Sequence, residues 1–599
     1  MIDSLKKEEC TGCGVCVDVC PVHAISMNLD SEGFGYPVID KDVCTQCNLC
    51  EKTCPVLHID RLKKNDFHEP LCYGGYSKNL EQRFESTSGG AFSALAMQMY
   101  KEGGYVGGAV YDELYFIHHY ISNDKKDLTR LRSSKYAQSD AVGFYKKVKD
   151  LLNEGNKVLV CGTPCQMAGL RSFLRKDYES LIIIDFICLS ISSPKVQRLY
   201  LDHIEKEQKA SVIDLKYKAK DIGWHTLSKR IRLANGKTIY TSRGNDLLSN
   251  IFHNHLSARP CCFDCKFKGF PRMADLTLAD FWGVDKLKPH LDNNCGTSAV
   301  LLNSEKGKSF FEKAAHRMIL EEVSVKDLLP GNPALVHSLS RPPEREEFMR
   351  CLDTEPFDKL VERILPVASG GLKKFIVQSV RNLRNFFITT TLHPVPVYQF
   401  IRYNFLSSNI KTSWRRGALI FPCRYCVIRI HKKAKINLDG HIILGEKRVK
   451  GSKLETRFLM DANSYLYVKT RFRIMYGGDV EVFENAQLIV DWCGGNINNT
   501  IICGHKIEFG YQVALGRDVR IRDNNGTHQI ALEGYKQSHP VKIGTHVWLC
   551  SGAEIMPGST IQDGAIVGAN SVVSGKVKAH TLVSGSPAKL IEENIYWNL

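Results

Sequence analysis

The stretch that decides the fold class of this chain is CTGCGVCVDVCP at residues 10–21, and it recurs as CTQCNLCEKTCP at residues 44–55. Each run has the spacing Cys-x2-Cys-x2-Cys-x3-Cys-Pro. A Cys-x2-Cys-x2-Cys loop wraps three thiolates around a 4Fe–4S cube, and the fourth thiolate comes from elsewhere in the chain. A zinc site would use two pairs of ligands rather than two quartets, and a disulfide knot is the other alternative. The spacing therefore predicts two iron–sulfur clusters and a protein that handles electrons.

The paired runs resemble the bacterial two-cluster ferredoxins, in which each cluster takes its fourth ligand from the other run. The resemblance implies a small α+β fold, which we expect over residues 1–60. It also implies that one cluster is held by Cys10, Cys13, Cys16 and Cys54, and the other by Cys44, Cys47, Cys50 and Cys20.

The length and cysteine content of the chain limit its class. A chain of 599 residues is too long for one core, so three or four domains are expected. Its 22 cysteines do not indicate a secreted disulfide framework, because no basic-then-apolar leader precedes Cys10 and cluster thiolates need a reducing compartment. The longest apolar run, residues 181–191, is interrupted by Asp185 and is too short to span a bilayer. We therefore expect a cytoplasmic protein.

Residues 72–350 alternate between strand-like runs and helical patterns, which predicts an α/β domain. Glycine-rich turns stand where the strands end, the usual place for a ligand in an open α/β sheet. The expected strands cover residues 105–111, 157–160 and 181–186, and the expected helices cover residues 91–100 and 141–152.

Several motifs in this segment, taken in order, resemble the coenzyme F-420 hydrogenase/dehydrogenase beta-subunit family, which are flavoproteins that carry FAD. The motifs are Ser88-Gly89-Gly90, Ser134-Lys135-Tyr136, Gly162 to Gln166, Asp185 to Cys188, Gly223-Trp224, Cys262-x2-Cys265, Asp275 to Gly283 and Gly296-Thr297-Ser298. The resemblance implies a third 4Fe–4S cluster, held by Cys165, Cys188, Cys262 and Cys265. The alternative is that these are apolar cysteines of an ordinary core. Cys261 stands beside the pair and competes for the iron, whereas Cys161 and Cys295 are expected to be structural.

The same resemblance places the flavin at Ser88, Gly89 and Gly90, just before a helical pattern. Backbone N–H groups at a helix N-terminus suit a pyrophosphate such as that of FAD, and a plain turn is the alternative. Lys135 is expected to contact the phosphate or the flavin. Clusters pass single electrons, and a flavin collects two and delivers them as a hydride.

The last 160 or so residues contain a repeat of six. Such a period matches neither an α-helix nor a plain strand, and it predicts short parallel rungs of a β-helix. Aliphatic side chains recur at Ile543, Leu549, Ile555, Ile561, Val567 and Val573, and upstream in the same phase at Ile501, Ile507, Val513 and Val519.

This region resembles the hexapeptide-repeat acyltransferases of sugar-modifying type, which are left-handed β-helices. The matching motifs include residues 541–544, 555–558 and 585–589. The resemblance implies a homotrimer with acetyl-CoA or another acyl-CoA between neighbouring subunits. It also implies a histidine base in the loop at residues 522–540, for which we assign His528 with Asp523 as its orienting partner. His539 and His505 are weaker candidates, and Lys589 is expected to meet the CoA phosphates.

A basic stretch separates the two halves. Residues 364–438 contain 13 Lys and Arg and no Asp or Glu, and the chain as a whole carries a net charge of +16. Apolar side chains at Leu372, Phe375, Ile376, Leu383, Phe386 and Phe387 approximate one face of a helix that Pro394 and Pro396 end. We favour docking on a surface such as anionic lipid at the inner face of the membrane, over nucleic-acid binding or a solvated linker.

The sequence therefore predicts a multidomain protein: a small α+β two-cluster ferredoxin, an α/β flavin-binding domain, a basic linker and a parallel β-helix. The boundaries are residues 1–60, 72–350, 364–438 and 439–599. The first hypothesis is a bifunctional enzyme that takes electrons from a donor such as reduced ferredoxin and acylates a sugar, a sugar nucleotide or a lipid-linked sugar for a surface polysaccharide. The second is an electron-transfer subunit trimerised by an inactive β-helix. The third, a protein that keeps the folds without cofactors, conflicts with the intact cysteine quartets.

Overall fold

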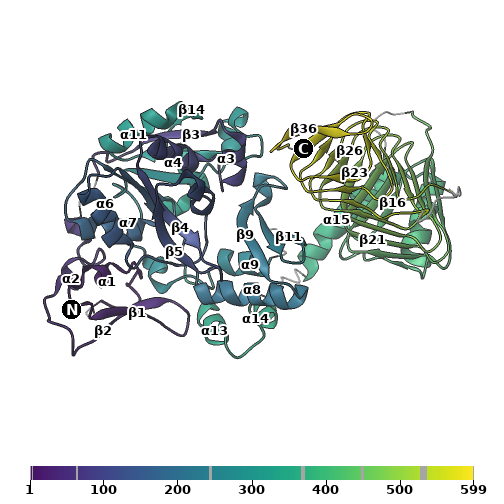
Figure 1. Ribbon diagram of the computed structural model, residues 1–599. Coiled ribbons are helices and arrows are strands. Elements are labelled where there is room, and N and C mark those ends of the chain that lie inside the picture. Colours follow the sequence, from purple (N-terminus) through teal and green to yellow (C-terminus); the bar gives the residue numbers. More distant parts are fainter. Residues whose placement is uncertain are drawn as a thin grey trace. The chain divides into compact units, whose positions relative to one another are not determined.

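The computed structural model describes residues 2–597 except for residues 3–4, 63–64, 242–245, 366–370, 447–450 and 527–535. The described chain forms two compact units, Met1–Val367 and Ala368–Trp597, whose elements are labelled in Figure 1. None of the described helices has both the length and the apolar composition needed to cross a bilayer.

The first sixty residues fold as a small α+β part of the first unit. Helix α1 (Val15–Val19) begins after Gly14, whose φ of 80° lies in the left-handed region that glycine adopts without strain. Strands β1 (Ile25–Leu29) and β2 (Gly35–Ile39) pair as an antiparallel hairpin, and the short helix α2 (Leu49–Lys52) follows. The α+β fold predicted for this segment is present.

A mixed sheet forms the centre of the first unit. Its four inner strands are parallel neighbours: β4 (Tyr105–Tyr111), β7 (Val158–Gly162), β8 (Leu181–Phe186) and β12 (Leu276–Asp280). Antiparallel strands extend it on both sides: β5 (Ile117–Ser122) beyond β4, and β13 (Ser298–Leu302), β3 (Leu71–Ser77) and β14 (Met318–Val323) beyond β12. The predicted strands at 105–111 and 181–186 coincide with β4 and β8.

Helices cover both faces of this sheet, because successive residues of a buried strand point to opposite sides. In β8, Ile182 and Ile184 pack with helices α4 (Ala91–Lys101) and α11 (Glu305–Ala315). Leu181 and Ile183 pack with α6 (Phe144–Asn153) and α7 (Pro164–Leu174) on the other face. Figure 1 shows α6 and α7 on the side of the sheet that lies toward α1 and α2.

Two buried arginines fasten the N-terminal part to the rest of the unit. The Arg259 guanidinium donates to the carbonyl oxygens of Cys10 at 2.8 Å and Gly35 at 3.0 Å, and to Gln138 Oε1 at 2.7 Å. Arg345 donates to Glu32 Oε2 at 2.6 Å. Neither arginine is exposed to solvent, so the N-terminal part is an integral piece of the unit.

The second unit is a parallel β-helix with three ladders of strands. The long strands β21 (Tyr465–Met475) and β23 (Gln487–Gly495) each serve two of the ladders, and the third runs from β17 (Cys426–Ile430) to β33 (Val572–Val573). The ten aliphatic residues of the predicted period are all buried along its axis. Ile555, for example, aligns with Ile521 in the coil before it and with Val573 in the coil after it. The predicted parallel β-helix is therefore present.

The β-helix begins earlier than predicted. Strands β15 (Ile410–Lys411), β16 (Ile420–Pro422) and β18 (Lys435–Leu438) pair in parallel with β18, β19 (His441–Glu446) and β21, respectively. Residues 410–438 are thus its first coils, and assigning them to a basic linker was wrong. The strands of these coils lack the strict period of six, and their basic side chains lie outside the core. The predicted helix is present as α15 (Gly371–Thr390), but Pro394 opens a further helix, α16 (Pro394–Ile401).

Candidate functional site

The first predicted cysteine set surrounds one pocket in the N-terminal part. Cys10, Cys13, Cys16 and Cys54 line it together with apolar side chains. Gly12 and Gly14, both with positive φ, let the loop between the cysteines turn sharply. Burial, with the neighbouring Cys54 and Cys10 thiols, raises the pKa of Cys13 to about 12. Because iron binds the thiolate, a cluster here would have to displace protons that burial retains.

The second predicted set lies nearer the surface. Cys20 and Cys50 are buried, Cys44 is half-buried and Cys47 is exposed. Cys20 and Cys50 belong to the same apolar cluster as Cys16 and Cys54 of the first set, and Cys44 packs against it. The two sets therefore adjoin, and the predicted crossed ligation of the two runs stays a prediction.

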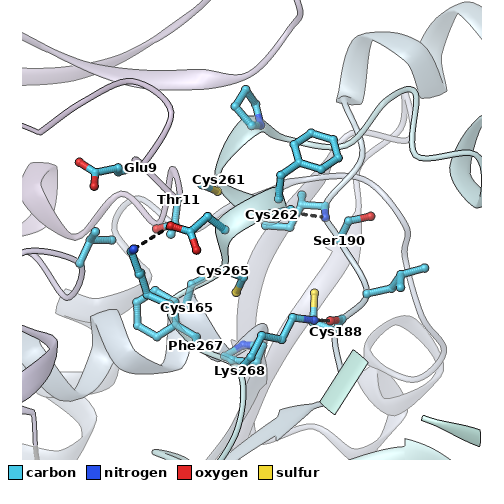
Figure 2. Close-up of a pocket in the computed structure, with 18 of the residues that line it drawn as sticks. Glu9, Thr11, Cys165, Cys188, Ser190, Cys261, Cys262, Cys265, Phe267 and Lys268 are labelled. Atoms are coloured by element: carbon cyan, nitrogen blue, oxygen red, sulfur yellow. Dashed lines mark hydrogen bonds and ion pairs between the residues drawn. The ribbon is translucent and has the colours of Figure 1, made fainter. Parts of the chain in front are cut away.

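A larger pocket, of about 240 Å³, brings together the four cysteines predicted for a third cluster (Figure 2). Cys165 lies in the first turn of α7, directly after β7, and Cys188 follows β8. These positions are the carboxyl ends of neighbouring parallel strands, where α/β sheets hold their ligands. Cys262 and Cys265 come from the short helix η5 (Pro260–Asp264) and the residue after it. Cys261, Leu189 and Ser190 also line the pocket.

Hydrogen bonds and burial define the chemistry of these thiols. Thr163 Oγ1 lies 3.2 Å from Cys165 Sγ, and the Ile191 N–H donates to Cys262 Sγ at 3.5 Å. A hydrogen bond from Cys261 lowers the pKa of Cys262, whereas burial raises the pKa of Cys188 to about 12. In the described chain no group of three Cys, His, Asp or Glu side chains is arranged to hold a single metal ion. A cube of four irons and four sulfides is larger than one ion and takes cysteines that stand further apart.

The pocket rests on a buried ion pair. Arg272 donates to Asp185 Oδ2 at 2.7 Å, and Thr277 Oγ1 donates to the other oxygen of this carboxylate at 2.5 Å. Lys268 donates to the Cys188 carbonyl oxygen at 2.5 Å. Because buried charges are retained only when paired, this network fixes the end of β8 from which Cys188 projects.

The first set and the larger pocket are neighbours. Thr11 and Val56 line both pockets. The Tyr145 hydroxyl donates to the Cys13 carbonyl oxygen at 2.8 Å, and this tyrosine belongs to helix α6 beside α7. In the described chain the three cysteine sets therefore follow one another in space. The set with the exposed Cys47 comes first, the set at Cys10 is next, and the pocket at the end of the sheet is last.

The glycine-rich segment that precedes α4 lies beside the other predicted flavin motifs. Ser88 Oγ donates to the Thr297 carbonyl oxygen at 2.7 Å, and the Ser134 N–H donates to Thr87 Oγ1 at 2.8 Å. A Cβ at Gly89 would lie 2.5 Å from the Gly75 carbonyl oxygen, so this position accepts only glycine. Gly90, with φ of 87°, starts α4.

Lys135 has a different environment from the one predicted for a phosphate ligand. Its Nζ donates to the carbonyl oxygens of Arg130, Arg132 and Ser133 at 2.7, 3.1 and 3.2 Å, at the end of the short helix α5 (Leu128–Leu131). Burial lowers the pKa of Lys135 to about 7. In this conformation the ammonium group is occupied by backbone acceptors, and its contact with a flavin stays a prediction.

Three lysines that sequence reasoning missed lie near the glycine-rich segment that precedes α4. Lys220 donates to the carbonyl oxygens of Ser88 and Arg83, Lys216 pairs with Glu85 at 2.6 Å, and Lys218 pairs with Asp280 at 2.5 Å. Asp280 Oδ1 is buried and has no hydrogen-bond partner among the described residues. The signal in the sequence was Lys-x-Lys-x-Lys, which spans the end of β9 (Val212–Ala219).

In the β-helix, the carboxylate of Asp523 holds a turn. It is fully buried and accepts the N–H groups of Gly504 at 2.6 Å, His505 at 2.8 Å and Lys506 at 2.5 Å. His528 lies outside the described residues, so its pairing with Asp523 stays a prediction. Lys589, on β36 (Lys589–Glu593), is exposed beside the turn at residues 584–587.

Sequence models of three protein families match the chain in order. Residues 9–57 match the 4Fe-4S dicluster domain, residues 155–327 match the C terminus of the coenzyme F420 hydrogenase/dehydrogenase beta subunit, and residues 540–575 match the bacterial transferase hexapeptide. Three separate segments of the chain are therefore similar to three known families. The three-part description inferred from its motifs is therefore confirmed.

Individual relatives match single parts of the chain. Galactoside O-acetyltransferase of Escherichia coli is 28% identical over 120 residues, which are 20% of this chain and 56% of that protein. The chain spans about half the length of the curated relatives it matches. A chain of the F420-reducing NiFe hydrogenase complex from Methanosarcina barkeri is 18% identical, with a TM-score of 0.31, over 50% of this chain and 94% of that one. A maltose O-acetyltransferase from Clostridium difficile is 19% identical, with a TM-score of 0.17, over 37% of this chain and 87% of that one.

Proposed function

We propose that the protein is a bifunctional enzyme, an iron–sulfur flavin oxidoreductase joined to an acyl-CoA-dependent transferase. The observation that carries the redox half is the pocket of Figure 2, in which five cysteines from three separate loops meet beside the first N-terminal set. Ordinary core cysteines have no reason to converge on one open pocket. A donor such as reduced ferredoxin would approach the exposed Cys47.

Cys165, Cys188, Cys262 and Cys265 fit a third 4Fe–4S cluster, and the segment from Ser88 to Gly90 fits the pyrophosphate of FAD. Bound clusters supply single-electron transfer, and bound FAD supplies two-electron hydride chemistry. The side chain of Lys220 lies beside Ser88, where burial and the nearby Lys216 and Arg83 hold its pKa well below the usual range. The N-terminus of α4 adds its N–H groups. The Ile191 N–H would stabilise the negative charge on the Cys262 sulfur.

The transferase half rests on the hexapeptide match and on the buried Asp523 turn that leads into the loop of His528. In the proposed reaction His528 removes a proton from a sugar hydroxyl or amine. The freed electron pair bonds to the acyl carbonyl carbon of acyl-CoA, the carbon–sulfur bond breaks, and the CoA sulfur receives a proton. Neighbouring subunits of a homotrimer would enclose the acyl-CoA, with Lys589 at its phosphates. The proposed acceptor is a sugar, a sugar nucleotide or a lipid-linked sugar of a surface polysaccharide.

The iron, sulfide and flavin content of protein purified without oxygen tests the redox half. Three clusters and a flavin predict about twelve irons and one FAD per chain. About eight irons and no flavin would leave a dicluster part tethered to a transferase and would overturn the proposal.

A second candidate function is an electron-transfer subunit whose β-helix only trimerises it. The engagement of Asp523 by three backbone N–H groups favours it, because that carboxylate already has a structural task. An acetyl-CoA assay on the full chain distinguishes the two, since replacing a general base lowers the rate by about 10²–10⁴-fold. His528→Asn should lower the transfer rate by that factor while iron content stays constant, and His539→Asn is the matched control. Absence of transfer by the unaltered protein across sugar classes would support the subunit hypothesis.

A further inference from the structure

Helix α15 buries polar side chains and exposes apolar ones, the reverse of an ordinary surface helix. Its buried side is largely polar: Asn382 Nδ2 donates to the Trp414 carbonyl oxygen at 2.8 Å, and Thr390 Oγ1 donates to the Phe386 carbonyl oxygen at 2.8 Å. Trp414 Nε1 in turn donates to Ser379 Oγ at 2.9 Å. A surface helix of a globular protein normally buries its apolar side.

Most apolar side chains of this helix and of the segment after it are exposed, although Phe400 and Tyr403 are buried in the core. Of the 31 large apolar side chains that are exposed in the described chain, 13 lie within residues 375–406. We call these 13 the outer apolar face: Phe375, Ile376, Val377, Val380, Leu383, Phe387, Ile388, Leu392, Val395, Tyr398, Ile401, Phe405 and Leu406. Such concentrated apolar exposure marks an interaction surface rather than the scattered exposure of most proteins.

Positive charge accompanies the outer apolar face. Arg381, Arg384 and Arg402 are exposed among its residues. Residues 364–438 contain no acidic side chain at all, so no carboxylate of the segment neutralises these arginines. The partner is therefore expected to be both apolar and negatively charged.

An anionic lipid bilayer has both properties. A second copy docked face to face would bring two basic segments together, which is unfavourable. Nucleic acid would pair with the arginines but would leave the aliphatic side chains in water. An anionic bilayer takes the apolar side chains into its interface and pairs its headgroups with the arginines. Because no described helix is able to cross a bilayer, the helices would lie in the plane of the interface.

We propose that α15, α16 and the segment through Leu406 dock this protein on the surface of an anionic lipid bilayer. The inference stands on the outer apolar face alone and does not depend on either catalytic half. Its consequence would be to hold the β-helix unit within reach of substrates that are themselves attached to lipid.

Flotation of the full-length protein with vesicles tests this proposal. The vesicles contain either phosphatidylcholine alone or phosphatidylcholine with phosphatidylglycerol in equal parts. We expect binding to the anionic vesicles only, and weaker binding as salt screens the arginines. The double variant Val380→Asp/Ile388→Asp, at side chains that are 61% and 57% exposed, should bind at least about tenfold more weakly.

The matched control is Leu454→Asp/Ile591→Asp, which makes the same change at side chains of the second unit that are 49% and 58% exposed. It should bind vesicles as the unaltered protein does. A third variant, Arg381→Glu/Arg384→Glu, should lose the preference for anionic vesicles. Thermal unfolding of each variant shows that the fold is retained.

Three outcomes would overturn the proposal. One is the absence of vesicle binding by the unaltered protein, and another is an equal loss in the control variant. The third is that Val380→Asp/Ile388→Asp leaves vesicle binding intact but dissociates an oligomer or releases bound RNA, which would assign the outer apolar face to a second copy or to nucleic acid.

Discussion

The eight cysteines of residues 10–54 and the four around the pocket of Figure 2 are brought together in different ways. The first eight lie on two short loops. Residues at positive φ let each loop turn sharply, Gly12 and Gly14 in the first and Gln46 and Asn48 in the second. The other four depend on the tertiary structure: Cys165 and Cys188 stand at the ends of neighbouring strands, and Cys262 lies on a loop some 75 residues further along. Cysteines close together in the sequence, a local array, are positioned by a loop. Cysteines far apart in the sequence, a scattered array, are positioned by the whole sheet.

Replacing Cys13 by Ala should have the largest effect, because this residue belongs to a local array and also packs with Tyr145 and Met167 beneath the sheet. We expect the loss of about four irons per chain together with a lower denaturation midpoint. Iron analysis and urea unfolding measure the two effects. Loss of iron at unchanged stability would show that the local array is independent of the sheet.

Replacing Cys188 by Ala should remove about four irons and leave the electron paramagnetic resonance signals of the two N-terminal clusters intact. Cys161→Ala is the matched control, since Cys161 lies on β7 near the pocket but does not line it. Equal loss of iron in the two variants would mean that the pocket is not a cluster site.

Replacing Arg272 by Lys tests how far the cysteines of the scattered array depend on the buried Arg272–Asp185 pair. Lys keeps the charge beside Asp185 but cannot also reach Thr277 as the guanidinium does at 3.3 Å. We expect the free energy of unfolding to fall by about 1–2 kcal/mol with all irons retained. Preferential loss of four irons would show that this pair controls the cysteine positions directly.

Replacing Cys261 by Ser should have the smallest effect. Its thiol donates a hydrogen bond to Cys262, and hydrogen bonds to cluster sulfurs tune the potential without holding the iron. Iron content should be unchanged, with a shift in one midpoint potential measured by redox titration. A loss of about four irons would make Cys261, rather than its neighbour, the ligand.

The same distinction explains what could be predicted from the sequence. The cluster spacing, the period of six and the strands at 105–111 and 181–186 are local patterns, and each is present in the structure. The set at Cys165, Cys188, Cys262 and Cys265 has no local pattern, and only the resemblance to a family suggested it.

Other features depend on contacts that no spacing encodes. The first coils of the β-helix escaped prediction because their rungs are irregular and their basic composition resembles a linker. Lys220 donates a hydrogen bond to the carbonyl oxygen of Ser88, which lies 132 residues away in the sequence. The exposure of the apolar side of α15 depends on Trp414, a residue outside the helix that hydrogen-bonds to its polar side.

Arg259 determines how the N-terminal part is able to meet an electron donor. Its three hydrogen bonds, made inside the protein, fix the N-terminal part against the sheet. Small electron-transfer proteins ordinarily diffuse between their donor and their acceptor, whereas this N-terminal part is held in one place by the rest of the unit. An electron donor therefore has to bind to the protein at this part.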